Sequence, residues 1–156
     1  MLDPFGTAAD RFRLPATGPT DDMHPGWPES TPFVRLPASA VFPSGARMRL
    51  RPLLRSDGHE WRRQRIEDES FLRSVEPTQA APWAAAHSQQ AWWNHLMYLR
   101  TAAREALVVP LVIEVEGQFV GQITLGNIQH GSIRDCWIGY WVYLSLIHIS
   151  EPTRPY

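Results

Sequence analysis

The sequence contains a single cysteine, Cys136, and no lysine. One cysteine excludes an internal disulfide and any Cys-x-x-Cys metal or redox motif, which agrees with a reducing compartment. The histidines His59, His87, His95 and His130 lack the spacing of metal ligands, and we expect surface or capping roles for them. Metal binding therefore has no support in the sequence.

Long apolar runs are absent as well. Uninterrupted runs such as Leu111 to Ile113 fall far short of the roughly 18 residues that a membrane span needs, and residues 1–10 lack a secretory signal pattern. With 44% hydrophobic and 20% charged residues, the 156 residues suit one soluble globular domain. We expect a cytoplasmic protein with a single core.

The charge is nearly balanced, with a net value of -1, which argues against wholesale nucleic-acid binding. All fifteen basic residues are arginines, and seven of them lie between Arg47 and Arg65. Only Asp57 and Glu60 oppose those seven, so this arginine stripe carries a local charge of +5. A solvated strand edge and helix face would explain the stripe, and contact with RNA or an acidic partner is the alternative.

Residues 1–45 hold eight of the fourteen prolines and show no sustained periodicity, so we expect an N-terminal arm or linker. Met23 is an alternative start, in which case residues 1–22 would be an upstream extension. Regular structure is expected from Ala46, where apolar residues alternate with arginines in the pattern of a half-buried strand.

Two helical stretches should follow this strand. Asp57 and Glu60 have the spacing of a capping box, which predicts a helix that continues to about Ile66. A second short helical stretch surrounds Phe71, and a loop is expected from Val75 to about residue 87, because the residue before a proline avoids the helical region.

The second half of the chain begins with an amphipathic helix from the N-cap Ser88 to about Glu105. Residues 111–115 and 119–125 then form two β-rich runs joined by a glycine-bearing turn, which predicts an antiparallel hairpin. Residues 136–142 are apolar on both faces, as in a central strand that is covered on each side.

Several strings, in this order, resemble the ribosomal-protein (Rim-type) branch of the GNAT N-acetyltransferases. They are RMRLRPLLRSD (47–57), VEPT (75–78), PLVIEVEGQFVGQITLGNI (110–128) and WIGYWV (137–142), and the stretch from Met23 to Pro28 also resembles a family start. The resemblance implies an α+β fold with a mixed, mostly antiparallel sheet and flanking helices. Residues 46–143 would form its N-terminal part, through the fourth strand.

The resemblance further implies transfer of an acetyl group from acetyl-CoA to an amine, in this branch a protein N-terminal α-amine. The amine must lose its proton before it attacks, and a backbone N–H must stabilise the thioester oxyanion. In the family that N–H lies near the end of the fourth strand, which corresponds to Tyr140, Trp141 and Val142. Gly139 beside them suits a bulge or close backbone approach, or it accommodates a neighbouring tryptophan.

Three further residues are weaker candidates for the site. Glu114 and Glu76 are candidates for the base or for holding the amine, although a strand glutamate near a hairpin is usually solvent-facing. Asn127 should end its strand where the family lines its peptide groove, but an asparagine there also suits a simple turn.

The family's pyrophosphate loop, Arg/Gln-x-x-Gly-x-Gly/Ala, should begin a few residues after Val142, yet residues 143–156 contain no glycine. Residues 144–156 resemble a translated sequencing adaptor, so we expect a non-native tail that packs poorly. This predicts a chain that binds no acetyl-CoA usefully and is inactive. The alternative is a non-enzymatic module that binds RNA or protein through the arginine stripe.

Overall fold

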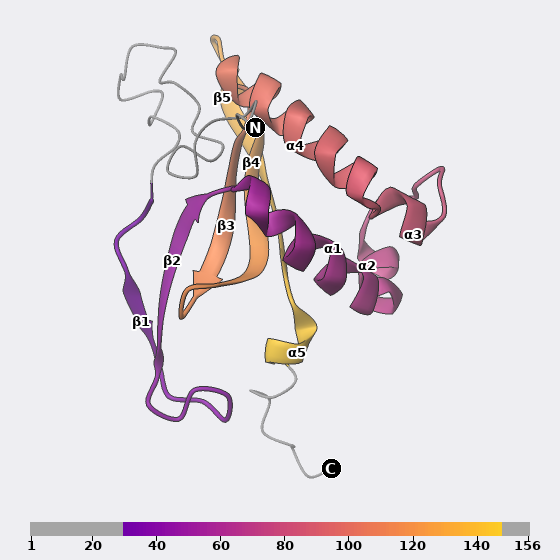
Figure 1. The fold of residues 1–156 in the computed structure, drawn as a ribbon. Coiled ribbons are helices and arrows are strands. Elements are labelled where there is room, and N and C mark those ends of the chain that lie inside the picture. The colour runs from indigo at the N-terminus through magenta and orange to yellow at the C-terminus, as the bar shows by residue number, and fades with distance from the viewer. Residues whose placement is uncertain (1–29, 148–156) are drawn as a thin grey trace, which may run out of the picture.

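The computed structural model describes residues 30–147. Its five strands form one antiparallel sheet in the order β1-β2-β3-β4-β5 (Figure 1). The strands are β1 Val34–Leu36, β2 Ala46–Pro52, β3 Val109–Val115, β4 Gln118–His130 and β5 Arg134–Val142. The helices are α1 Gly58–Glu67, α2 Glu69–Val75, α3 Trp83–Ala86, α4 Gln89–Arg104 and α5 Leu144–Ile147, with a 3-10 turn at Arg55–Asp57. None of the helices within these described residues is long and apolar enough to cross a membrane.

The predicted strand at Ala46 is confirmed, but strand pairing begins earlier in the chain. β1 lies inside the segment expected to be an arm, and Arg35 pairs with Arg47 of β2. Thr31 reinforces the pairing, because its N–H donates to the carbonyl of Leu50 at 2.9 Å. A three-residue strand is too short to show a period, and its partner on β2 holds it in place.

The helices at Gly58–Glu67 and Glu69–Val75 confirm the two predicted helical stretches, but the predicted capping box is wrong. Asp57 is the N-cap residue of α1 without making a side-chain capping bond. Its carboxylate instead accepts from the N–H of Leu54 at 2.7 Å and pairs with Arg51. Arg51 and Leu54 together occupy both oxygens of Asp57, so neither oxygen caps α1.

The expected loop after Val75 contains a short helix that periodicity did not reveal. α3 has four residues, and it places Trp83 in the core with its indole N–H donating to the carbonyl of Arg65 at 2.8 Å. The next helix is as predicted, since Ser88 caps α4 by accepting from the N–H of Ala91 at 3.1 Å. Tertiary contact of one tryptophan therefore fixes α3, whereas local sequence fixes α4.

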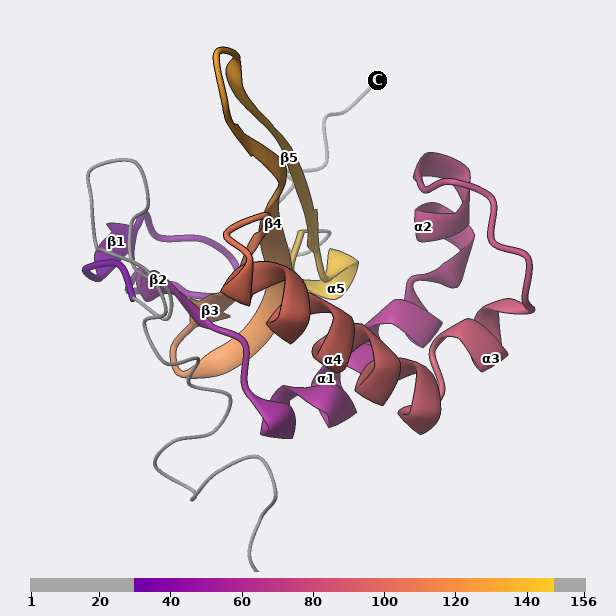
Figure 2. The same cartoon turned by 90° about the horizontal axis from the view of Figure 1, so that it is seen from above.

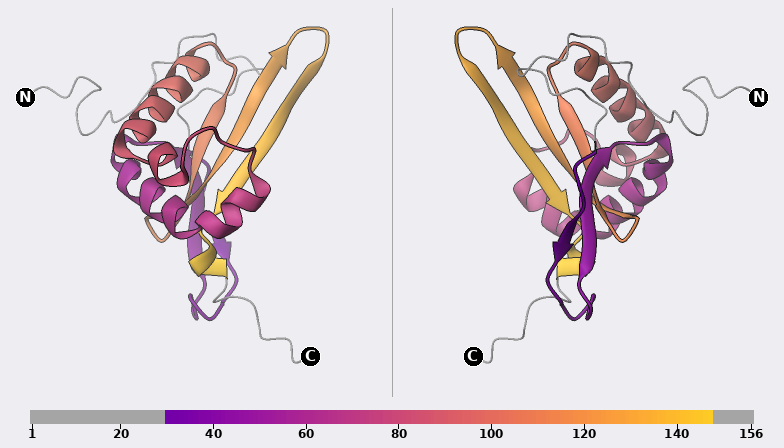
Figure 3. Two further views of the ribbon diagram at one scale, coloured as in Figure 1. Left: turned by 90° about the vertical axis from the view of Figure 1, so that its right-hand side faces the viewer. Right: turned by 90° about the vertical axis from the view of Figure 1, so that its left-hand side faces the viewer.

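Helices α1 to α4 lie on one face of the sheet, as the two views of Figure 3 show. The main core fills the space between these helices and the sheet. Its buried members are Leu53, Trp61, Trp92, Leu96, Leu99, Ala102, Ala103, Val108, Val112 and Phe119. A smaller cluster of Ala46, Val115 and Val120 receives Leu36, Phe42, Met48, Ile113 and Leu146.

The expected hairpin turn at Glu116 and Gly117 is present, and both residues have positive φ. β3 and β4 pair antiparallel around it, which confirms the predicted hairpin. β4 is longer than expected and reaches His130, because its outer half pairs with β5 rather than with β3.

β5 is not covered on both faces, contrary to the sequence prediction. It is the edge strand of the described sheet, and Trp137, Ile138 and Tyr140 are 53%, 62% and 73% exposed. The reason is geometric: the β4–β5 hairpin extends past the ends of the helices, as Figure 2 shows, so its outer part has no helix above it.

The segment after β5 packs better than the sequence suggests. The N–H of Leu144 donates to Asp68 at 2.8 Å, and Leu146 packs against the smaller hydrophobic cluster. Residues 1–29 and 148–156, which include the alternative start Met23 and most of the expected non-native tail, lie outside the described residues.

Candidate functional site

A groove of about 850 Å³ separates the helical layer from β4 and β5. Residues from α1, α2, α3 and α4 line one wall, and residues from β4, β5 and the start of α5 line the other. Residues of α2 and of β5, two elements that Figure 2 shows apart from each other, are among those that line it. Here the sheet edge and the helices enclose a space large enough for a ligand.

Four of the predicted site residues line this groove. Tyr140, Trp141 and Val142 contribute the β5 wall, and Glu76 contributes the opposite wall beyond α2. Trp141 also contacts the core, with its ring 5.8 Å from that of Phe119. The structure therefore brings the predicted cofactor strand and one predicted carboxylate together.

The guanidinium of Arg65 lies in the wall of the groove among three tryptophans. It is 5.5 Å from the ring of Trp61, 5.6 Å from that of Trp83 and 5.2 Å from that of Trp141. Its Nη2 pairs with Glu76 at 2.5 Å, while its buried Nε has no hydrogen-bond partner. Cation–π contacts and one ion pair thus hold a positive charge beside the predicted cofactor strand.

The pair with Arg65 bears on the predicted role of Glu76. Its side chain is 24% exposed and reaches the groove, but one oxygen is already bound by the guanidinium. That oxygen must leave the guanidinium before it can bind an amine or a water molecule.

Two polar side chains that the sequence did not single out line the same groove, His95 and Gln122. His95 comes from α4 and Gln122 from β4, and the two side chains lie next to each other in the wall. Burial, together with the charge of Arg65, lowers the pKa of His95 to about 4, although a side-chain hydrogen bond with Gln122 opposes part of this shift. The imidazole is therefore neutral at pH 7.

His95 had a recognisable signal in the sequence. It lies three residues after Trp92 and so shares the apolar face of α4, where it stacks on Trp61 at a centroid distance of 5.3 Å. His87 is 1% exposed, its Nδ1 donates to the carbonyl of Trp83 at 2.7 Å, and burial lowers its pKa. A surface position is wrong for both histidines, because tryptophans of α1, α3 and α4 cover them. The expected capping role is confirmed for His87, which is the C-cap residue of α3.

Glu114 lies away from the groove in a buried ion-pair network, so the expectation that it faces solvent is wrong. One of its oxygens accepts from Arg49 Nε at 2.7 Å, and the other accepts from Arg51 Nε. Arg51 also binds both oxygens of Asp57 at 2.9 Å. Burial alone would raise the pKa of Glu114, but its two arginine partners lower it, which suits a structural carboxylate better than a base.

Asn127 does not end its strand, and it does not line the groove. β4 continues past it to His130, and a bulge interrupts the register between Gly126 and Gln129. Asn127 has a φ of 49°, a left-handed conformation that asparagine tolerates well. The positive φ and the register shift together identify Asn127 as part of a β-bulge.

Gly139 pairs with Thr124 without a bulge. A Cβ on Gly139 would lie 2.9 Å from Cζ3 of Trp137, and the same indole lies over Gly126. Of the two explanations that the sequence left open, accommodation of a neighbouring tryptophan fits this geometry, although Trp137 is itself half exposed.

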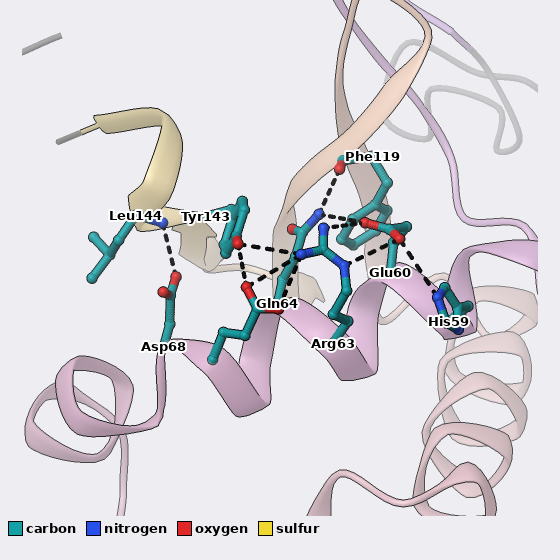
Figure 4. A network of polar contacts seen from close by, with 9 residues as sticks. His59, Glu60, Arg63, Gln64, Asp68, Phe119, Tyr143 and Leu144 are labelled. Carbon is teal, nitrogen blue, oxygen red and sulfur yellow. Dashed lines mark hydrogen bonds and ion pairs between the residues drawn. The ribbon is translucent and has the colours of Figure 1, made fainter. Parts of the chain in front are cut away.

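A polar network ties the end of β5 to α1 next to the groove (Figure 4). Arg63 binds Glu60 at 2.6 Å, Glu67 at 3.1 Å and the hydroxyl of Tyr143 at 3.2 Å. Gln64 donates to the carbonyl of Phe119 at 2.8 Å. These bonds fix the spacing between the two walls.

The arginine stripe is largely occupied by contacts within the chain. Arg49, Arg51, Arg63 and Arg65 all pair with carboxylates, and Arg51 and Arg65 are buried. Phosphate contacts require a continuous basic surface, and most arginines of this stripe do not contribute to one. Among residues 30–147, no group of three or more His, Cys, Asp or Glu side chains is arranged to hold a metal ion.

The chain is similar to several proteins of known structure. No protein-family model matches the chain, and no curated protein sequence matches it. Mycobacterium smegmatis RimJ in complex with CoA-disulfide is 38% identical, with a TM-score of 0.68 over 78% of this chain and 55% of that one.

Two more distant structures share the fold. A ribosomal-protein-S5-alanine acetyltransferase from Vibrio fischeri is 16% identical, with a TM-score of 0.54 over 72% of this chain and 57% of that one. RimL, a ribosomal L7/L12 α-N-protein acetyltransferase in complex with coenzyme A, is 14% identical, with a TM-score of 0.53 over 76% of this chain and 63% of that one. The chain thus spans between 55% and 63% of the length of these three proteins.

Proposed function

The chain belongs to the Rim-type branch of the GNAT N-acetyltransferases by sequence and fold, and on that premise we propose that its groove receives a protein N-terminal α-amine for acetylation by acetyl-CoA. The proposed enzyme is cytoplasmic, and its acceptor is a ribosomal protein or another protein with a free N-terminus.

One observation carries the proposal: the predicted cofactor strand forms a wall of the groove. The main chain of Tyr140, Trp141 and Val142 lies at the sheet edge, where an N–H can face a thioester oxygen. A backbone N–H that is held in position stabilises the oxyanion that develops when the amine attacks. The opposite wall is apolar around Trp61 and Leu72.

The proposed chemistry is direct transfer. The nitrogen of a neutral amine forms a bond to the thioester carbonyl carbon, the carbon–sulfur bond breaks, and the thiolate takes a proton as it leaves. Glu76 remains a candidate for receiving the amine proton through water, provided that its pair with Arg65 opens. Glu114 is a weaker candidate for the base, because Arg49 and Arg51 occupy both of its oxygens.

The test uses a chimera in which residues 30–142 continue into the C-terminal part of Mycobacterium smegmatis RimJ. It would be incubated with acetyl-CoA and a mixture of peptides that begin with alanine, serine or methionine, and mass spectrometry would locate any acetyl group. We expect acetylation of the N-terminal amine. Peptides with a blocked N-terminus and an internal lysine are the matched control, and acetylation of those alone would overturn the proposed acceptor class.

A further inference from the structure

A second pocket, of about 790 Å³, lies on the helical layer and shares no lining residue with the groove described above. The beginning of α1, the beginning of α4 and the 3-10 turn before α1 supply its walls. We call it the arginine pocket, because no carboxylate is among the described residues that line it. Its polar and aromatic lining consists of Arg55, His59 and Arg62 from one wall and Gln89, Gln90 and Trp93 from the other.

The basic side chains of this pocket belong to the arginine stripe. His59 and Arg62 are three residues apart on α1, so their side chains are neighbours on the helix surface. Arg55, in the 3-10 turn directly before the helix, lines the same space. Part of the positive charge of the stripe is thus gathered around one cavity, although the net charge of the whole chain is -1.

Arg62 brings a positive charge that nothing in the described part of the chain neutralises. Its Nε donates to the carbonyl of His87 at 3.3 Å, and within residues 30–147 its two terminal nitrogens have no hydrogen-bond or ion-pair partner. The other arginines of α1, Arg63 and Arg65, pair with carboxylates instead. The two terminal nitrogens of a guanidinium form a planar fork that matches two oxygens of a phosphate.

An aromatic ring and two amides accompany the arginines. The guanidinium carbon of Arg55 lies 5.4 Å from the ring centroid of Trp93, which α4 contributes. Gln89 and Gln90 add amide groups that can both donate and accept hydrogen bonds, as the edges of bases require. Sites for single-stranded RNA combine arginines for phosphates with aromatic rings and guanidinium planes on which bases stack. An acidic peptide needs the cations alone, so the combination favours RNA.

We propose that the arginine pocket binds a short single-stranded segment of RNA, with Arg62 and Arg55 on its phosphates and a base against the Arg55–Trp93 pair. The inference is independent of the proposed acetylation, because the pocket and the groove have no lining residue in common. A chain held on RNA in this way keeps its groove open.

Fluorescence anisotropy with the 156-residue chain tests the inference. Fluorescein-labelled hexauridylate is the probe, and hexaglutamate with the same label is the control of similar charge. We expect hexauridylate to bind with a Kd of about 10⁻⁵ M at low salt, and hexaglutamate to bind about tenfold more weakly. Equal binding of the two probes, or no binding of hexauridylate, would overturn the proposal.

The salt dependence of binding reports the number of phosphate contacts. Each contact with a single strand adds about 0.7 to the slope of log K against log salt concentration, so the two arginines predict a slope of about -1.4. A slope near zero would show that the probe binds without phosphate contacts and would contradict the proposed role of the arginines.

Three variants locate the site. Arg62→Gln should weaken binding of hexauridylate about tenfold, as the loss of one charge-assisted hydrogen bond does, and should reduce the slope by about 0.7. Arg62→Lys keeps the charge without the fork, so it should restore the slope and only part of the affinity. Arg73→Gln is the matched control, because Arg73 lies on α2 outside the pocket and its side chain is 63% exposed. An equal loss with Arg73→Gln would show that net charge alone binds the probe.

Near-ultraviolet circular dichroism shows whether each variant keeps its fold, and Arg55→Gln replaces Arg62→Gln in the comparison if the latter does not. The peptide assay of the chimera is a separate measurement. RNA binding without acetylation would contradict only the proposed function, and acetylation without RNA binding would contradict only the arginine pocket.

Discussion

Arg51 of β2 is the centre of a buried ion-pair network. Its guanidinium binds Asp57 through two nitrogens and binds Glu114 through a third, so one cation balances two carboxylates. Its pKa is raised, because these bonds and charges outweigh the lowering by burial. Removing the cation would leave two negative charges within a poorly hydrated space.

We therefore expect Arg51→Met to reduce the free energy of unfolding by about 3–5 kcal/mol, the cost of breaking a buried pair on one side. Arg49→Met is the matched control, because Arg49 also pairs with Glu114 but its side chain is 32% exposed. Its loss should be below about 1 kcal/mol. Urea denaturation at pH 7 measures both, and equal losses would contradict the assigned burial.

His95 predicts a pH dependence of stability. Its pKa is about 4 in the folded chain against an ordinary 6.5, so the unfolded chain takes up the proton first as pH falls. Stability from this residue is complete above pH 6.5 and decreases toward pH 4, by about 3 kcal/mol in total. Urea denaturation between pH 7 and pH 4.5 should show a smaller decrease for His95→Gln, and an unchanged slope would contradict the burial of the imidazole.

At the level of elements, the contact between α1 and α4 depends on the absence of a side chain at Gly58. A Cβ there would lie 2.7 Å from Cε2 of Trp92, whose ring is 4% exposed and cannot move aside. The same indole belongs to the core that supports Trp61 and the groove wall. The spacing of the two helices is thus set by a glycine against a tryptophan.

Gly58→Ala should destabilise the chain by about 1–3 kcal/mol, the usual cost of overpacking. This is the opposite of the gain that alanine normally gives over glycine in a helix. Gly131→Ala is the control, because no atom lies within 4 Å of its Cβ position, and its effect should stay within about 0.5 kcal/mol. Thermal denaturation of both variants decides the matter, and a stabilised Gly58→Ala would contradict the packing described.

The β4–β5 hairpin carries several exposed large apolar side chains. Trp137, Ile138 and Tyr140 face solvent along an edge strand, an arrangement that promotes association between chains. The bulge near Asn127 increases the twist of this hairpin and so works against flat edge-to-edge pairing.

At the scale of the whole molecule, residues 1–156 lack a segment of the kind that holds the cofactor's phosphates. The sequence contains no Arg/Gln-x-x-Gly-x-Gly/Ala segment after Val142, and β5 has one strand neighbour in the described sheet. Backbone N–H groups at a helix N-terminus hold phosphates, and side chains of the groove do not replace them.

We expect no micromolar binding of acetyl-CoA by the 156-residue chain in calorimetric titration. The chimera with the C-terminal part of RimJ is the comparison, and it should bind. Micromolar binding by the shorter chain would show that the cofactor site lies elsewhere in the described residues.

The sequence by itself determined the elements that local chemistry specifies. Alternation at residues 46–51, the glycine turn at 117 and the cap at Ser88 each act within a few residues, and the structure has the strand, the hairpin and the helix that they predict. The order of these elements also carried the family resemblance. Local preferences suffice here because they agree with the tertiary fold.

Only the tertiary structure decided what depends on distant partners. β1 exists because β2 pairs with it, α3 exists because Trp83 reaches the core, and the exposure of β5 follows from where the helices end. The site divides in the same way: the β5 wall was predicted from sequence, whereas the places of His95, Gln122 and the partnerless Nε of Arg65 in the groove wall were not. Burial and unmet hydrogen bonding arise from residues far apart in the chain, so no local pattern records them.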